Sequence, residues 1–111
     1  VIEYVEAPDE AGHSGNPQAK IQSLQQIDTH IVAPVLKRLK QEGDDWRLLI
    51  LPDHPTPCTL RTHTREAVPF ALAGKDTAGI VEAQFNEQTA KEADLHIAKG
   101  CNLMEFFLKV R

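Results

Sequence analysis

Two pairs of aspartate and histidine residues, Asp9 with His13 and Asp53 with His54, carry side chains that could do chemistry in this sequence. A further histidine, His63, follows the second pair in the same polar stretch. Imidazole binds zinc, manganese and iron, and a carboxylate adds the negative charge that holds a divalent cation. Either pair alone is weak evidence, because such spacings also occur by chance. The two pairs together with His63 predict a transition-metal site.

The second pair directly follows a short apolar run. Leu48 to Leu51 is too short and too uninterrupted for an amphipathic helix, so the run predicts a strand, which we expect over Arg47 to Leu51. Three prolines between positions 52 and 57 prevent regular structure immediately after it. Asp53 and His54 are therefore expected at the carboxyl end of a strand, where a loop begins.

The first pair is expected in a similar place. Val1 to Val5 alternates and is rich in β-branched and aromatic side chains, which favours a strand. Gly12 and Gly15 allow backbone conformations closed to other residues, so Asp9 to Gly15 is expected to be a tight loop rather than a helical turn. Because the sequence starts with valine inside this strand, we expect an excised domain or the carboxyl-terminal part of a longer chain.

A long helix should connect these two strands. Asn16 followed by Pro17 is a helix start signal, and apolar residues recur at helical spacing from Ile21 onward. Pro34 predicts a kink, and Gly43 is the natural residue to end the helix. Strand, helix and strand in this order predict two parallel strands, whose carboxyl ends share one edge of the sheet and bring both Asp/His pairs to the same side.

The remaining elements are less strongly marked, and the overall expectation is one α/β domain over residues 1–111. The expected elements are a third strand at Val68–Ala73, a turn at Lys75–Gly79 and helices at Thr89–Ala93 and His96–Leu108. The last helix would place one face in the core, formed by Ile97, Cys101, Met104, Phe107 and Leu108.

Composition narrows the possible partners. The 111 residues carry a formal net charge of −4. The chain therefore has no excess of basic residues that would bind nucleic acid or an anionic membrane surface. Its two cysteines are too few for a disulfide framework, and no signal peptide is visible. No apolar stretch approaches the roughly 20 residues that span a bilayer. These features predict a cytoplasmic protein with reduced thiols.

Ordinary structural roles could also explain the candidate residues. Asp9 could cap a turn, His13 could be a surface residue, and Asp53 could accept backbone hydrogen bonds in the proline-rich turn. Cys58 and the two helical histidines, His30 and His96, are more simply explained without a ligand role. Arg61 could clamp a phosphoryl oxygen with two hydrogen bonds beside a metal site.

Three segments carry a family resemblance: EAPDEAGHSGN, LPDHPTPCTLRTHTREAVPF and FNEQTAKEADLHIAKGCNLMEFFL. In this order they closely resemble the carboxyl-terminal part of the archaeal-type 2,3-bisphosphoglycerate-independent phosphoglycerate mutases, which belong to the alkaline-phosphatase-like metalloenzyme superfamily. The resemblance covers essentially the whole chain. It implies part of a three-layer α/β/α sheet with mostly parallel strands and flanking helices.

The resemblance also implies a centre with two divalent metal ions, manganese (Mn²⁺) or zinc (Zn²⁺). Asp9, His13 and His63 match ligands of one ion, and Asp53 and His54 match ligands of the other. Such a pair of ions supports transfer of a phosphoryl group, here between the two hydroxyls that distinguish 2-phosphoglycerate from 3-phosphoglycerate in glycolysis and gluconeogenesis.

The family's nucleophilic serine, first metal-binding aspartate and substrate-binding insertion lie upstream of the part that this sequence matches. Ser14 and Ser23 do not match the nucleophile's motif. We therefore expect the 111 residues alone to be inactive and to need the missing amino-terminal part. An uncovered strand edge would favour self-association.

Two alternatives remain open at the level of sequence. A related phosphotransferase or phosphatase could use the same metal site on another small metabolite, for example homoserine. A non-catalytic interaction module could retain the fold without the reaction. The residues that determine which of these activities the protein has lie upstream of this stretch.

Overall fold

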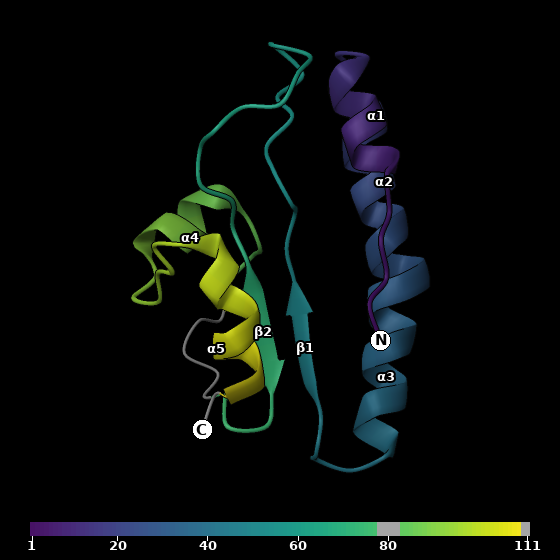
Figure 1. Ribbon diagram of the computed structural model, residues 1–111. Coiled ribbons are helices and arrows are strands. Elements are labelled where there is room, and N and C mark those ends of the chain that lie inside the picture. The colour runs from purple at the N-terminus through teal and green to yellow at the C-terminus, as the bar shows by residue number, and fades with distance from the viewer. Residues whose placement is uncertain (78–82, 110–111) are drawn as a thin grey trace. The chain divides into compact units, whose positions relative to one another are not determined.

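The computed structural model describes residues 1–77 and 83–109 (Figure 1). The chain forms two compact units. Unit 1 consists of Val1–Arg38 and His54–Ala67, and unit 2 consists of Leu39–Asp53 and Val68–Arg111. No helix in the described ranges is long and apolar enough to cross a membrane.

Unit 1 contains a helical hairpin. Helix α1 (Ala7–His13) packs beside α2 (Pro17–Ile27), and the chain reverses between them (Figure 1). The Asn16 side chain accepts a hydrogen bond from the backbone N–H of Ala19 at 3.0 Å, which confirms the predicted helix start.

The loop predicted over Asp9 to Gly15 is wrong, because most of it is α1. Pro8 lies in the first turn of the helix, where its missing N–H costs nothing, and the acidic Asp9 and Glu10 complement the helix dipole there. Only Gly15 behaves as expected, since its φ of +66° lets the chain turn immediately after the helix.

The strand predicted for Val1 to Val5 is also wrong. These residues are exposed and form no strand, and the sheet of the described residues contains only β1 (Arg47–Ile50) and β2 (Ala71–Gly74). A β-branched sequence forms a strand only where a neighbouring strand completes its hydrogen bonds. The expected pair of parallel strands around the helix is therefore absent from the described residues.

The long helix continues through Pro34, as expected. Between α2 and α3 (Ala33–Gln41) lies a π-helical segment, Asp28–Val32, in which the backbone N–H of Ala33 bonds to the carbonyl of Asp28. Pro34 has no N–H to give to the preceding turn, and the wider π turn is how the helix accommodates it. Gly43, with a φ of +109°, follows the end of α3.

The strands β1 and β2 of unit 2 confirm two predicted strand positions. They pair antiparallel, with Arg47 opposite Gly74 and Ile50 opposite Ala71. The helices and this sheet agree with the α/β class. A two-stranded antiparallel sheet does not reproduce the three-layer, mostly parallel arrangement that the resemblance implied.

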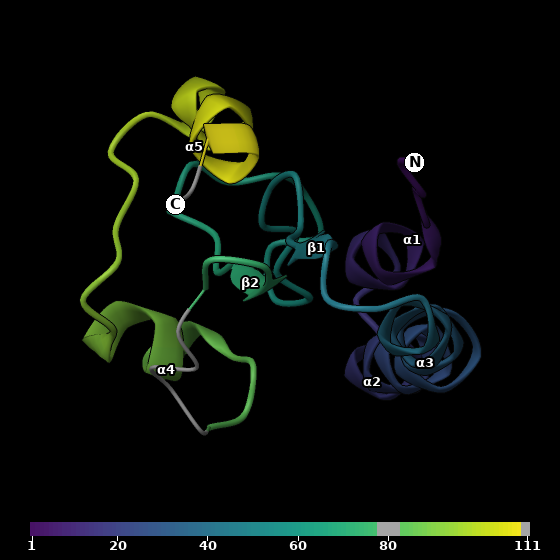
Figure 2. The same cartoon turned by 90° about the horizontal axis from the view of Figure 1, so that it is seen from below.

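Two short helices of unit 2 lie apart, on different sides of the strand pair (Figure 2). Helix α4 (Glu87–Glu92) confirms the predicted helix near Thr89, and the Asn86 side chain caps it by accepting from the N–H of Thr89 at 2.8 Å. The last predicted helix is shorter than expected: a 3₁₀ turn, Gly100–Asn102, leads into α5 (Leu103–Lys109).

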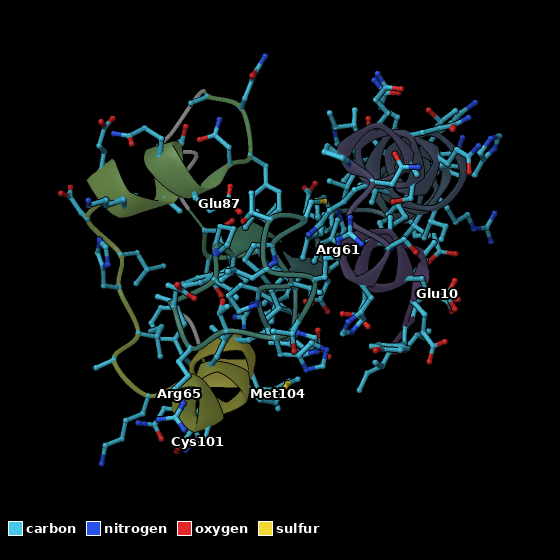
Figure 3. All side chains as sticks on the ribbon, turned by 90° about the horizontal axis from the view of Figure 1, so that it is seen from above. Glu10, Arg61, Arg65, Glu87, Cys101 and Met104 are labelled. Carbon is cyan, nitrogen blue, oxygen red and sulfur yellow. The ribbon has the colours of Figure 1, made fainter. Side chains whose placement is uncertain are left out.

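The core face predicted for the last helix is largely wrong. Leu103 is buried, but Cys101 and Met104 are exposed on this segment (Figure 3), and Leu108 is 66% exposed. Arg47 ties the end of α5 to β1, because its guanidinium donates to the carbonyls of Phe107 and Leu108 at 3.0 Å each. The expected turn after β2 is present at Lys75 and Asp76, and its end at Gly79 lies outside the described residues.

Candidate metal centre

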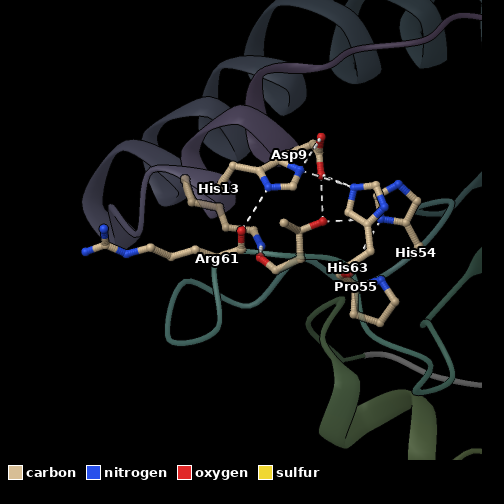
Figure 4. A network of polar contacts seen from close by, with 8 residues as sticks. Asp9, His13, His54, Pro55, Arg61 and His63 are labelled. Atoms are coloured by element: carbon tan, nitrogen blue, oxygen red, sulfur yellow. Dashed lines mark hydrogen bonds and ion pairs between the residues drawn. The ribbon is translucent and has the colours of Figure 1, made fainter.

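Helix α1 places Asp9 and His13 four residues apart, so both side chains lie on one helix face. The loop after His54 brings His63 to the same place (Figure 4). His13 Nε2 lies 3.3 Å from Asp9 Oδ2, and His63 Nε2 lies 3.2 Å from Asp9 Oδ1. The two Nε2 atoms are 3.2 Å apart. Three groups that can each bind a metal therefore converge in unit 1.

The spacing of these three groups suits a shared ion. Donors bound to one ion at about 2.0–2.2 Å lie roughly 3–3.5 Å from each other. The observed separations of 3.2 and 3.3 Å fall in that range. The side chains of Asp9, His13 and His63 are 31%, 44% and 50% exposed, so an ion and a substrate could both reach them from solvent.

The His13 ring is held in the form that a metal needs. Its Nδ1 lies 2.9 Å from the carbonyl oxygen of Arg61, and a carbonyl can only accept. The proton is therefore on Nδ1, and the Nε2 lone pair faces the cluster. A second hydrogen bond of this kind is the usual way in which proteins orient a metal-binding histidine.

Asp9 supplies the negative charge of the cluster. The Thr56 hydroxyl donates to the carboxylate, and this bond is the main reason that the pKa of Asp9 lies below its ordinary value. Partial desolvation opposes the shift, and the nearby imidazoles of His13, His63 and His54 add to it. The carboxylate therefore stays ionised and can attract a cation.

The second predicted pair is divided in the structure. The His54 ring lies against the His63 ring, with centroids 3.5 Å apart, and so borders the cluster (Figure 4). Asp53 belongs to unit 2 and is not one of the three clustered residues of unit 1. Of the five predicted ligands, four thus lie together in unit 1.

Arg61 contributes to this site through its backbone. Its φ of +54° is unusual for a residue with a side chain, and it directs the carbonyl toward His13. The guanidinium points away from Asp9 and His63 (Figure 4) and lies against Gly15, where an added Cβ would be 2.4 Å from Nε. The proposed clamp on a phosphoryl oxygen stays a prediction.

Sequence reasoning missed Thr56 and Lys20. Thr56 is only 4% exposed, and its hydroxyl lies 2.6 Å from Asp9 Oδ1. The Lys20 ammonium group donates to the Thr56 carbonyl at 2.7 Å. The position of Thr56 between two prolines, two residues after His54, was the available signal. Nothing in the spacing of Lys20 pointed to this contact.

A carboxylate and two imidazoles converging between a helix and a loop define an α/β protein equipped to bind a divalent metal. The comparison with protein families agrees: the model for the metalloenzyme superfamily matches residues 1–110, so the chain belongs to the metalloenzyme superfamily. No solved structure gives a significant match.

Curated relatives of the chain carry a more specific name. The 2,3-bisphosphoglycerate-independent phosphoglycerate mutase of Methanosarcina barkeri is 40% identical over 112 residues, which cover 100% of this chain and 28% of the relative. A protein of Geobacter sulfurreducens, named as a probable enzyme of the same kind, is 42% identical over 108 residues, covering 95% of this chain and 26% of the relative. The chain thus spans about a quarter of the length of these relatives.

Proposed function

We propose that this chain is the metal-binding part of a phosphoglycerate mutase that works without 2,3-bisphosphoglycerate. The observation that carries the proposal is the convergence of Asp9, His13 and His63 in a chain about 40% identical to proteins of that name. The proposed reaction interconverts 2-phosphoglycerate and 3-phosphoglycerate, as a step of glycolysis and gluconeogenesis in the cytoplasm.

In this proposal, two divalent ions, manganese or zinc, are bound. Asp9, His13 and His63 hold the first ion, and His54 with Asp53 contributes to the second. A pair of such ions offsets the negative charge of a phosphoryl group and so favours its transfer between oxygens. Imidazole and carboxylate donors suit both manganese and zinc, so the donor set alone does not choose between them.

The residues of the chain have defined tasks in this scheme. Asp9 neutralises part of the ion's charge, while His13, oriented by the Arg61 carbonyl, presents a lone pair. The exposed side of the cluster leaves room for a phosphorylated substrate. The Ser23 hydroxyl donates to the Lys20 carbonyl within α2, which supports a nucleophilic serine located elsewhere in the protein. We further propose that a three-layer α/β/α sheet is completed by residues outside this stretch.

The test uses the full-length protein. We expect it to convert 3-phosphoglycerate to 2-phosphoglycerate in a coupled assay with manganese or zinc and to lose this activity after chelation. His63→Ala removes one of the three donors and should lower the activity by at least about 100-fold. His96→Ala, which changes an exposed histidine of unit 2, should leave it unchanged.

Three results would contradict the proposal in different ways. A metal-dependent phosphatase or a homoserine phosphotransferase without mutase activity would retain the metal site and change the substrate. Full mutase activity in His63→Ala would instead remove this histidine from the metal centre. A protein that binds neither manganese nor zinc would favour a non-catalytic interaction module.

A further inference from the structure

Thr56 is the buried polar residue at the centre of the candidate site. At 4% exposure it is far less accessible than the three clustered donors, and its hydroxyl contacts two predicted ligands. Oγ1 lies 2.6 Å from Asp9 Oδ1 and 3.2 Å from His54 Nδ1. The same hydroxyl thus lies between a ligand predicted for one ion and a ligand predicted for the other.

The direction of these two hydrogen bonds follows from the groups themselves. An ionised carboxylate only accepts, so the single hydroxyl proton of Thr56 is donated to Asp9. The hydroxyl oxygen can then only accept from His54, which places the His54 proton on Nδ1. The Pro55 carbonyl oxygen, 3.4 Å from the same nitrogen, is also an acceptor and favours the same tautomer. In the neutral ring the lone pair is then on His54 Nε2, the atom that would bind a metal.

The backbone of Thr56 is fixed from two sides. Lys20 on α2 donates to its carbonyl at 2.7 Å, in a partly buried contact. Gly12 on α1 packs against it so closely that an added Cβ would lie 2.4 Å from the Thr56 carbonyl oxygen and 2.9 Å from its methyl carbon. The hydroxyl is therefore presented to Asp9 and His54 by a backbone that both helices hold in place.

We propose that Thr56 is a positioning residue shared by the two predicted ions: its hydroxyl orients the Asp9 carboxylate and fixes the metal-binding tautomer of His54. The proposal rests on the proposed function in so far as it assumes that these residues bind metal. Hydrogen-bond partners of metal ligands typically change the metal affinity by about 10- to 100-fold when they are removed. Loss of this hydroxyl should therefore weaken metal binding although Thr56 itself does not touch the ion.

The competing explanation is that Thr56 only fills space between α1 and the loop. Its methyl group does pack near Gly12. Two variants of similar size distinguish the two explanations. Thr56→Val keeps the shape and removes the hydroxyl, whereas Thr56→Ser keeps the hydroxyl and removes the methyl group. Thr59→Val, at an exposed threonine of the same loop, is the matched control.

The experiment measures manganese and zinc binding to the full-length protein by calorimetry. We expect Thr56→Val to weaken the affinity by about 10- to 100-fold and Thr56→Ser and Thr59→Val to stay within about threefold of the unchanged protein. Should Thr56→Val fail to fold, the pair Thr56→Ser and Thr56→Ala makes the same comparison, because these two differ only by the hydroxyl. Equal affinities with and without the hydroxyl would overturn the proposal.

A second measurement does not depend on bound metal. Nitrogen-15 NMR of the metal-free protein at about pH 8, where imidazole is ordinarily neutral, reports which nitrogen of His54 carries the proton. We expect Nδ1 in the unchanged protein, and a proton on Nε2 would overturn the proposal. If the unchanged protein binds no metal while His54 is protonated on Nδ1, the proposed function fails and the orienting role of Thr56 stands.

Discussion

At the scale of single residues, the site is organised around one carboxylate. Asp9 accepts from the Thr56 hydroxyl and lies within 3.3 Å of two imidazoles, whose Nε2 atoms can bind a cation only while they carry no proton. Metal binding to such a set is pH-dependent, because every ligand must be free of its proton. The residue types alone predicted this chemistry. The tautomer of His13 could not be predicted, since it depends on a left-handed backbone conformation at Arg61, a residue type that rarely adopts one.

The lowered pKa of Asp9 leads to a pH-dependent stability. Because the pKa is lower in the folded chain than in the unfolded chain, the ionised carboxylate stabilises the fold above about pH 4. This contribution is lost as the pH falls through the folded-state pKa. Removing the Thr56 hydroxyl removes the main cause of the shift. We expect the thermal midpoint of the metal-free protein to fall more steeply between about pH 4 and pH 2 than that of Thr56→Val.

Circular dichroism melts over this pH range would measure both slopes. Thr59→Val should follow the unchanged protein, because it leaves the Asp9 hydrogen bond intact. Parallel curves for the unchanged protein and Thr56→Val would show that the Thr56 hydroxyl does not set the pKa of Asp9.

At the scale of elements, sequence patterns worked where the signal was local. The helix start at Asn16, the strand at Arg47 to Ile50 and the short helix near Thr89 follow from a few neighbouring residues. The strand expected at Val1 to Val5 failed because a strand needs a partner, which no local pattern can supply. Helix α1 was missed because two glycines outweighed the proline and acidic residues of its first turn, although the Asp9–His13 spacing suits a helix face well.

Close packing against Thr56 explains why α1 contains a glycine at position 12. Alanine would favour the helix by about 1 kcal/mol. Its Cβ would, however, lie 2.4 Å from the Thr56 carbonyl oxygen, a backbone atom that also accepts from Lys20. Overpacking of this kind typically costs about 1–3 kcal/mol, so the steric effect wins. We expect Gly12→Ala to lower the free energy of unfolding, by up to about 2 kcal/mol once the helix gain is subtracted, and to weaken metal binding, as measured by urea denaturation and calorimetry.

Gly100→Ala is the matched control for this substitution. An added Cβ at Gly100 would meet nothing within 4 Å, so its effect should stay within about 0.5 kcal/mol. If both glycine variants were equally stable, close packing of α1 against the loop would not be the reason for Gly12.

At the scale of the whole molecule, the described residues contain a very small apolar core. Ala11 and Leu103 are its buried apolar members, and no large side chain in the described ranges is fully buried. Ile21 and Leu24, which belong to the predicted apolar stripe of the long helix, are more than half exposed. Burial of apolar surface is usually the largest stabilising contribution to a fold. In unit 1, polar contacts such as those of Thr56 with Asp9 and Lys20 join α1, α2 and the loop.

Metal binding should therefore stabilise this chain strongly. A ligand that binds only the folded state adds about 2.7 kcal/mol when its free concentration is one hundred times its dissociation constant. The cluster joins Asp9 and His13 on α1 to His63 on the loop, so an ion bound there would link two segments more than 40 residues apart in sequence.

We expect manganese or zinc to raise the thermal midpoint by several degrees, and a chelator to reverse the rise. His63→Ala should show a smaller rise, because the first ion loses its donor from the loop while the residues proposed for the second ion remain, and His96→Ala should show the full rise. An equal rise in His63→Ala would mean that the stabilising ion is not bound by this cluster.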